Sequence, residues 1–216
     1  MTNFIPIFPL EIIVYPGEKL NLHIFEDRYK QLISEINKEK KLFGIPPVIK
    51  NKISETGTQV AVEKIVKQYD DGKMDITIKG VSVFRILEVI ESIPAKLYSG
   101  AIVKHLSNDE NSNQRQLHTV LTAVRELHRI LNINKDFKKP DEELTSYDVA
   151  HHAGLSFNEE YELLNLLRED QRLEYLRRHL KKIIPVVAGA EALKKKIQMN
   201  GHFKELKGFD FGQSKK

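Results

Sequence analysis

The chain of 216 residues contains no cysteine. This absence excludes a disulfide framework, catalysis by a thiol, and any zinc site with cysteine ligands. The first residues, MTNFIPIFPLEII, include no basic segment and no long unbroken apolar run. We therefore predict neither a signal peptide nor a membrane-spanning segment, and the cytoplasm is the expected location. Hydrophobic residues account for 41% of the chain, which is enough to build a folded core.

Several catalytic motifs are also missing. A phosphate-binding loop needs a Gly-Lys pair followed by serine or threonine, but the only such pair, Gly72-Lys73, is followed by Met74. Gly-x-Ser-x-Gly and His-Glu-x-x-His do not occur, so the common ATPase, serine-hydrolase and zinc-protease classes are excluded. The histidines lack ligand spacing, because His151 and His152 are adjacent and would point about 100° apart on a helix. We predict no metal site and no cofactor.

Apolar and polar residues alternate at several places in residues 1–106, which is the period of a half-buried β-strand. The alternation is clearest at residues 20–24 and 74–78. Asp70-Asp71-Gly72 predicts a tight hairpin turn, because glycine tolerates the positive φ required there. The other elements predicted for this half are a helix at Glu26–Lys38 and strands near Val81–Ile90 and Leu97–Leu106, punctuated by Gly80 and Gly100. This pattern fits a small barrel-like sheet with one helix over an opening.

Residues 107–113 are polar and show no periodicity, so they are predicted to form a linker. Residues 114–200 are predicted to be helical, since apolar residues recur every three or four positions, first between residues 117 and 131. Helix N-termini are predicted at Thr145–Asp148 and Ser156–Glu159, which both fit a capping pattern.

Proline and charge distinguish the C-terminal region. We predict that Pro185 breaks or kinks a helix, which resumes over Ala188–Gln198. Residues 201–216 are predicted to form a basic, partly ordered tail, with Phe203, Phe209 and Phe211 as candidate docking residues. From residue 177 onward there are eleven Lys/Arg and three Asp/Glu, a local charge of +8 in a chain of +4, so residues 1–176 sum to −4. This distribution fits nucleic acid or an acidic partner, and a solvated lysine-rich helix face is the alternative explanation.

One segment imitates a DNA-binding helix-turn-helix. Within Tyr147–Phe157, Ala150 is followed four residues later by Gly154, as in the turn of that motif. The next helix would begin with Phe157–Tyr161, whose acidic residues repel phosphates. We therefore interpret the segment as a plain helical hairpin.

Residues 5–29, IPIFPLEIIVYPGEKLNLHIFEDRY, combine proline-interrupted apolar runs, an alternating strand and a charged helix start. This segment resembles the opening of the N-terminal domain of Lon proteases, a family of substrate-recognition modules. The resemblance extends over residues 4–200. Further segments similar to the family's strands, hairpin and helical bundle are Leu42–Ile45, Gly57–Val62, Asp71-Gly72, Ile78–Gly80, Phe84–Ile86 and Tyr147–Leu180, which includes Arg172-Leu173.

The resemblance implies an α+β fold: an N-terminal PUA-like β-pseudobarrel with one helix, followed by a C-terminal α-helical bundle. The implied organisation is a β-rich barrel at 1–106, the linker at 107–113, a bundle at 114–200 and the tail at 201–216. The Ser/Lys peptidase signature of full-length Lon proteases is absent, as is an ATP-binding loop. The chain is therefore expected to be a stand-alone, non-catalytic member of the family.

The resemblance further implies binding of unfolded or degron-bearing polypeptide. The expected role is that of an adaptor or client-binding protein in protein quality control, with a separate ATP-dependent protease as a partner and no membrane partner. A nucleic-acid-binding protein that uses the PUA-like barrel and the basic C-terminal region is the alternative, and an unrecognised enzyme is the third hypothesis.

The family's first motif supplies the candidate peptide-binding residues, which are Tyr15, Pro16, His23, Phe25, Arg28 and Tyr29. A capture surface needs exposed apolar groups with a polar rim. Structural roles are the alternative for several of them: Pro16 shapes a turn, Phe25 and Tyr29 lie in the core, and Arg28 pairs with a carboxylate that ties the helix to the barrel.

Overall fold

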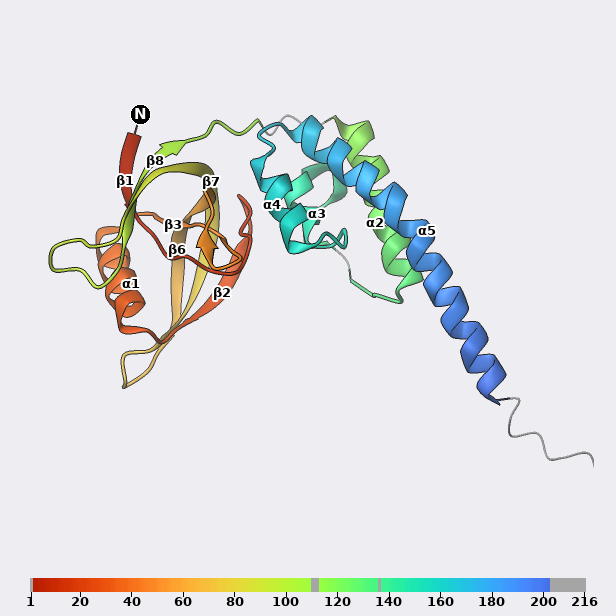
Figure 1. The fold of residues 1–216 in the computed structure, drawn as a ribbon, viewed down its shortest axis with the longest axis horizontal. Helices are drawn as coiled ribbons and strands as arrows, with labels where there is room; N and C mark the ends of the chain where they lie inside the picture. The colour runs from red at the N-terminus through yellow and green to blue at the C-terminus, as the bar shows by residue number, and fades with distance from the viewer. Residues whose placement is uncertain (1, 110–112, 136, 203–216) are drawn as a thin grey trace, which may run out of the picture.

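The computed structural model of the protein describes residues 2–109, 113–135 and 137–202. Figure 1 shows a β-rich N-terminal part with one helix beside a group of helices formed by the rest of the chain. None of the helices in the described ranges is long and apolar enough to span a membrane. The fold is therefore α+β with an antiparallel sheet and C-terminal helices, as predicted.

The main sheet has the strand order β1-β8-β7-β6-β3, and β2 pairs with β7 outside this path. Its strands are β1 (Thr2–Pro6), β2 (Lys19–Ile24), β3 (Phe43–Ile45), β6 (Thr56–Gln68), β7 (Met74–Ile90) and β8 (Gly100–His105). The short strands β4 (Val48–Ile49) and β5 (Lys52–Ile53) form a separate pair. Gly72 has a φ of 80° in the turn between β6 and β7, which confirms the predicted hairpin.

Helix α1 (Asp27–Glu39) covers the barrel core. Its apolar residues recur at the helical period and are buried on one face, with Leu32 and Ile33 fully inaccessible. They pack against the inward side chains of β2 and β7, such as Ile24 and Ile76. Because neighbouring side chains in a strand point to opposite faces, the residues between these inward ones are left on the outer surface of the barrel.

Strand β7 passes through Gly80 without interruption, so the prediction that this glycine punctuates two strands is wrong. A Cβ at position 80 would lie 2.0 Å from the carbonyl oxygen of Tyr15. The backbones also bond to each other, from Gly17 N to Gly80 O (3.0 Å) and from Gly80 N to Glu18 O (2.9 Å). Glycine at position 80 therefore permits the close approach of another backbone segment and does not end the strand.

The helices are α2 (Gln114–Ile130), the short 3₁₀ helix η1 (Asp141–Glu143), α3 (Ser146–Ala150), α4 (Phe157–Asn165) and α5 (Glu169–His202). Both predicted capping patterns are confirmed, since Thr145 with Asp148 and Ser156 with Glu159 each form a complete capping box. Gly154 has a φ of 71° in the turn between α3 and α4, and α3 has five residues. The segment that imitates a helix-turn-helix is therefore a helical hairpin of the bundle.

Helix α5 continues through Pro185, so of the predicted break or kink at this residue the break is wrong, and the kink stays a prediction. Proline has no N–H and leaves the Lys181 carbonyl without its helical partner. Both residues are exposed, so water can bond to that carbonyl. Figure 1 shows α5 extending beyond the other helices. Of the predicted tail, residues 201 and 202 end α5, and Phe203, Phe209 and Phe211 lie outside the described residues.

Barrel and bundle share part of one apolar core. Ile13, Tyr15 and Val83 of the barrel belong to the same buried cluster as the inward residues of α2 and α5. Within the predicted linker, the Asp109 carbonyl accepts a hydrogen bond from the Glu169 N–H (3.0 Å), which fixes this end of the segment to α5. The division into separate domains at 107–113 stays a prediction.

Candidate functional site

Three rings form an exposed group on the outer face of the barrel, which we call the aromatic cluster: His23, Phe25 and Tyr69. The His23 ring stacks with that of Phe25 at 6.1 Å between centroids and meets the ring of Tyr69 edge-on at 5.9 Å. Phe25, directly after β2, is 59% exposed. Its exposure contradicts the alternative interpretation of Phe25 as a core residue.

Strand register explains why these rings meet. Asp75 of β7 lies opposite His23 of β2 on one side and opposite Lys67 of β6 on the other. These side chains therefore form a row across three strands on the outer face. Tyr69 follows β6 by one residue and reaches the same row. No sequence pattern identifies Tyr69 as a site residue, because only the pairing of β6 and β2 with β7 brings it beside β2.

Asp75 fixes the orientation of two of the rings. Its Oδ1 lies 2.6 Å from His23 Nδ1, and its Oδ2 accepts a 2.8 Å hydrogen bond from the Tyr69 hydroxyl. The bond with His23, followed by that with Tyr69, lowers the pKa of Asp75, and the same bond to Asp75 raises the pKa of Tyr69. Lys67 Nζ lies 4.3 Å from the Tyr69 ring centroid. The cluster is thus an ordered apolar surface with a charged rim.

Arg28 and Tyr29 lie at the start of α1 and have different exposures. Tyr29 is buried and stacks on Phe8 at 3.7 Å between ring centroids, so it belongs to the core. Burial raises the pKa of its hydroxyl. Arg28 is exposed, lies over the Tyr29 ring at 4.5 Å, and pairs with Glu26 at 2.7 Å. Because Glu26 is two residues away in the same segment, this pair does not tie the helix to another part of the barrel.

Tyr15 and Pro16 lie at the contact between barrel and bundle and are both buried. The Tyr15 ring stacks on Tyr147 of α3 at 5.1 Å, and its hydroxyl donates to the Glu160 carbonyl at 3.0 Å. Burial, followed by the nearby Glu160 and Glu18 carboxylates, raises the pKa of the Tyr15 hydroxyl. Tyr15 therefore joins the two parts of the fold and offers no surface to a partner, and the structure does not bring it together with His23 and Phe25.

His151 makes a second connection at this contact. Its Nδ1 lies 2.7 Å from Glu160 Oε1 of α4, and its Nε2 lies 3.2 Å from Glu18 Oε2 of the barrel. Burial favours the neutral ring, but the hydrogen bonds to Glu160 and Glu18 outweigh it and raise the pKa of His151 to about 9. The protonated imidazole therefore bridges a carboxylate from each part of the fold.

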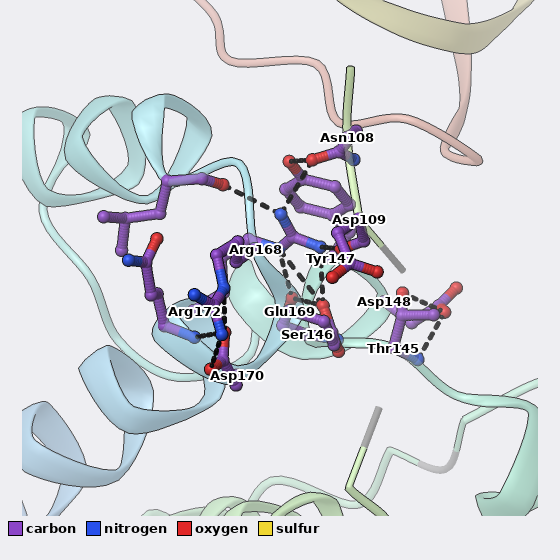
Figure 2. Close-up of polar contacts among 12 residues, drawn as sticks. Asn108, Asp109, Thr145, Ser146, Tyr147, Asp148, Arg168, Glu169, Asp170 and Arg172 are labelled. Carbon is purple, nitrogen blue, oxygen red and sulfur yellow. Dashed lines mark hydrogen bonds and ion pairs between the residues drawn. The ribbon is translucent and has the colours of Figure 1, made fainter. Parts of the chain in front are cut away.

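A buried ion pair between Arg172 and Glu169 holds the start of α3 in place (Figure 2). The side chains of Arg172 and Glu169 are fully inaccessible and are joined by a 2.7 Å contact between Nη2 and Oε2. Glu169 also accepts hydrogen bonds from the Ser146 N–H (2.7 Å) and hydroxyl (2.6 Å) at the start of α3. Arg172 donates to Asn108 Oδ1 (2.8 Å) and lies 4.2 Å from the Tyr147 ring centroid. These contacts fix the ring on which Tyr15 packs.

The comparisons with known proteins agree with this architecture. The family model described as "ATP-dependent protease La (LON) substrate-binding domain" matches residues 5–182. A Lon N-terminal domain protein from Xanthomonas campestris has a similar structure, with a TM-score of 0.60 and 22% identity over 81% of this chain and 96% of that chain. The N-terminal domain of a Mycobacterium avium complex Lon protease gives 0.60 and 14% over 83% of this chain and 98% of that chain.

No curated protein matches the chain. At these identities the two solved structures establish the fold, while the family model establishes the relationship in sequence over most of the chain. The resemblance predicted from residues 5–29 is thereby confirmed, and the chain belongs to the family of LON substrate-binding domains.

Proposed function

We propose that the protein is a non-catalytic polypeptide-recognition module that binds unfolded or degron-bearing chains through the aromatic cluster. Its role would be that of a cytoplasmic adaptor or client-binding protein in quality control, with a separate ATP-dependent protease as its partner. The observation that carries this proposal is the exposed ring of Phe25, ordered by stacking on His23, in a domain of the substrate-binding family.

The geometry of the cluster suits the capture of apolar side chains. An aromatic surface that is already ordered loses little conformational freedom when a client binds. The charged groups in contact with it, Lys67 and Asp75, can bond to the client backbone at the rim. Client selectivity would then depend on exposed apolar residues, which folded proteins bury and unfolded ones display.

Fluorescence anisotropy with a labelled, permanently unfolded polypeptide tests the proposal. We expect Phe25→Ala to weaken binding about fivefold to tenfold, which is the effect of losing one central aromatic contact. The matched control is Leu97→Ala, because Leu97 is also largely exposed (66%) and lies outside the cluster. Equal affinities for the Phe25→Ala variant and the unaltered protein would contradict the assignment.

The same experiment decides between this function and the nucleic-acid alternative. Apolar capture should persist at high salt, whereas binding to phosphates weakens steeply as salt is added. In the structure, Arg177 and Arg178 of the basic region both bond to Glu174. Salt-sensitive binding to an RNA or DNA pool, without binding to the unfolded polypeptide, would replace the proposed function.

A further inference from the structure

A pocket of about 470 Å³ lies between the barrel and the bundle, which we call the junction pocket. The barrel contributes the turn at residues 16–19, and the bundle contributes residues between 135 and 152. Four largely apolar side chains line it: Pro16, Phe137, Leu144 and Tyr147. Its volume is within the range of pockets that hold a small ligand or a few side chains of a peptide.

The charges of the junction pocket are mainly positive. Its lining includes four lysines and the protonated His151. Lys139 pairs with Asp148 at 2.7 Å, and Lys19 pairs with Glu63. Among the described residues, no carboxylate lies within ion-pair distance of Lys135 or Lys138, and both are exposed. Two cations at the pocket are therefore available to an incoming anion.

The carboxylates of the pocket already have partners within the fold. Glu18 accepts a hydrogen bond from the Tyr15 N–H at 2.9 Å and contacts His151. Asp148 accepts bonds from the N–H and hydroxyl of Thr145, both at 2.9 Å, and closes the capping box of α3. These groups shape the pocket and leave its remaining charge positive.

We infer that the junction pocket binds an acidic segment of a polypeptide. Carboxylates of that segment face Lys135 and Lys138, and a neighbouring apolar side chain packs on the partly exposed ring of Phe137. This inference rests on the proposed polypeptide-binding function and adds a second, chemically different contact for the same class of ligand. Charge complementarity over an apolar floor provides both affinity and selectivity for acidic sequences.

A nucleic acid fits this pocket less well than an acidic peptide. Binding a phosphate backbone requires an extended positive track that follows the chain. Here the cations surround a confined pocket that also contains the carboxylates of Glu18 and Asp148. A peptide can place one or two carboxylates beside the free lysines and keep the rest of its chain away from these two groups.

The test uses the full chain and three labelled ligands: a short peptide of alternating glutamate and leucine, the same peptide with glutamine for glutamate, and a permanently unfolded polypeptide. We expect the glutamate peptide to bind about tenfold or more tightly than the glutamine peptide. The double substitution Lys135→Glu with Lys138→Glu should abolish this preference and leave the effect of Phe25→Ala on the unfolded polypeptide unchanged.

The matched control is Lys52→Glu with Lys104→Glu, which makes the same charge change at exposed strand positions away from the pocket. A third variant, Phe137→Ala, tests the apolar floor of the pocket. It should lower the affinity for the glutamate peptide and should not raise the affinity for the glutamine peptide. Circular dichroism of each variant confirms the fold.

Three results would overturn the inference: equal affinity for the glutamate and glutamine peptides, equal effects of the two double substitutions, or displacement of the glutamate peptide by a uridine oligonucleotide that binds more tightly. If the unfolded polypeptide still binds in a Phe25-dependent manner, only the inference about the junction pocket fails. If neither peptide nor unfolded polypeptide binds, the proposed function fails with it.

Discussion

Removal of His151 should destabilise the protein in a pH-dependent way. The imidazole joins Glu18 of the barrel to Glu160 of the bundle, and its pKa is about 9, compared with the ordinary value of 6.5. A group whose pKa is higher in the folded chain than in the unfolded chain binds its proton more tightly in the fold. Its contribution to stability is therefore complete below about pH 6.5 and is lost as the pH rises through about 9.

The size of the effect follows from the same pKa difference. At about 1.4 kcal/mol per pH unit, the difference corresponds to about 3 kcal/mol. The side chain of His151 is 34% exposed, so solvent screening reduces this to roughly 1 to 2 kcal/mol. We expect His151→Gln to lower the free energy of unfolding by about that amount at pH 6, and by less than about 0.5 kcal/mol at pH 10.

Urea denaturation followed by circular dichroism at pH 6, 8 and 10 measures these free energies. The matched control is His23→Gln, which removes an exposed pair between a histidine and Asp75 and should change the free energy of unfolding by less than about 0.5 kcal/mol at each pH. An effect of His151→Gln that is equal at pH 6 and pH 10, or larger at pH 10, would refute the assignment of a charged bridge.

Three further substitutions test the fold. Arg172→Met leaves Glu169 as a buried, unpaired charge. In urea denaturation it should lower the free energy of unfolding by about 3 to 5 kcal/mol. A loss below about 1 kcal/mol would contradict the role of the pair. Gly80→Ala places a Cβ 2.0 Å from the Tyr15 carbonyl oxygen and should lower the melting temperature; an unchanged value would mean that the backbones separate without cost. Pro185→Ala restores a helical hydrogen bond and should slow amide exchange beyond that residue in α5, whereas unchanged exchange would show that Pro185 does not weaken the helix.

Local patterns predicted most elements because their periods are set by burial on one face. The alternation at residues 20–24 predicted β2, and the 3.6-residue period after Glu26 predicted α1. The two errors, at Gly80 and Pro185, have a common cause. The sequence rules treat glycine as the end of a strand and proline as the end of a helix. The effect of each residue, however, depends on what surrounds it, which is an approaching backbone at Gly80 and solvent at Pro185.

The candidate site could be predicted only in part for the same reason. His23 and Phe25 were selected by their place in a family motif, and the structure brings them together. Tyr15 comes from the same motif, but its burial depends on packing against Tyr147, 132 positions further along the chain. Tyr69 has no motif of its own and joins the cluster through strand register alone. Neither the packing of Tyr15 on Tyr147 nor the register that places Tyr69 beside His23 can be predicted from a local sequence pattern.

The two proposed contact sites lie at opposite ends of one strand. Lys19, the first residue of β2, lines the junction pocket, and Phe25 follows its last residue, Ile24. At about 3.3 Å per residue, β2 separates the sites by roughly 20 Å, which is the length of about six extended residues of a client. Among the described strands, only β7 pairs with β2, so the other edge of β2 has no strand partner along the path between the two sites. A client with an acidic and an apolar residue at this spacing would reach both sites, and contact at one would raise the effective concentration at the other. Recognition would then depend on the spacing of residues in the client as well as on their chemistry.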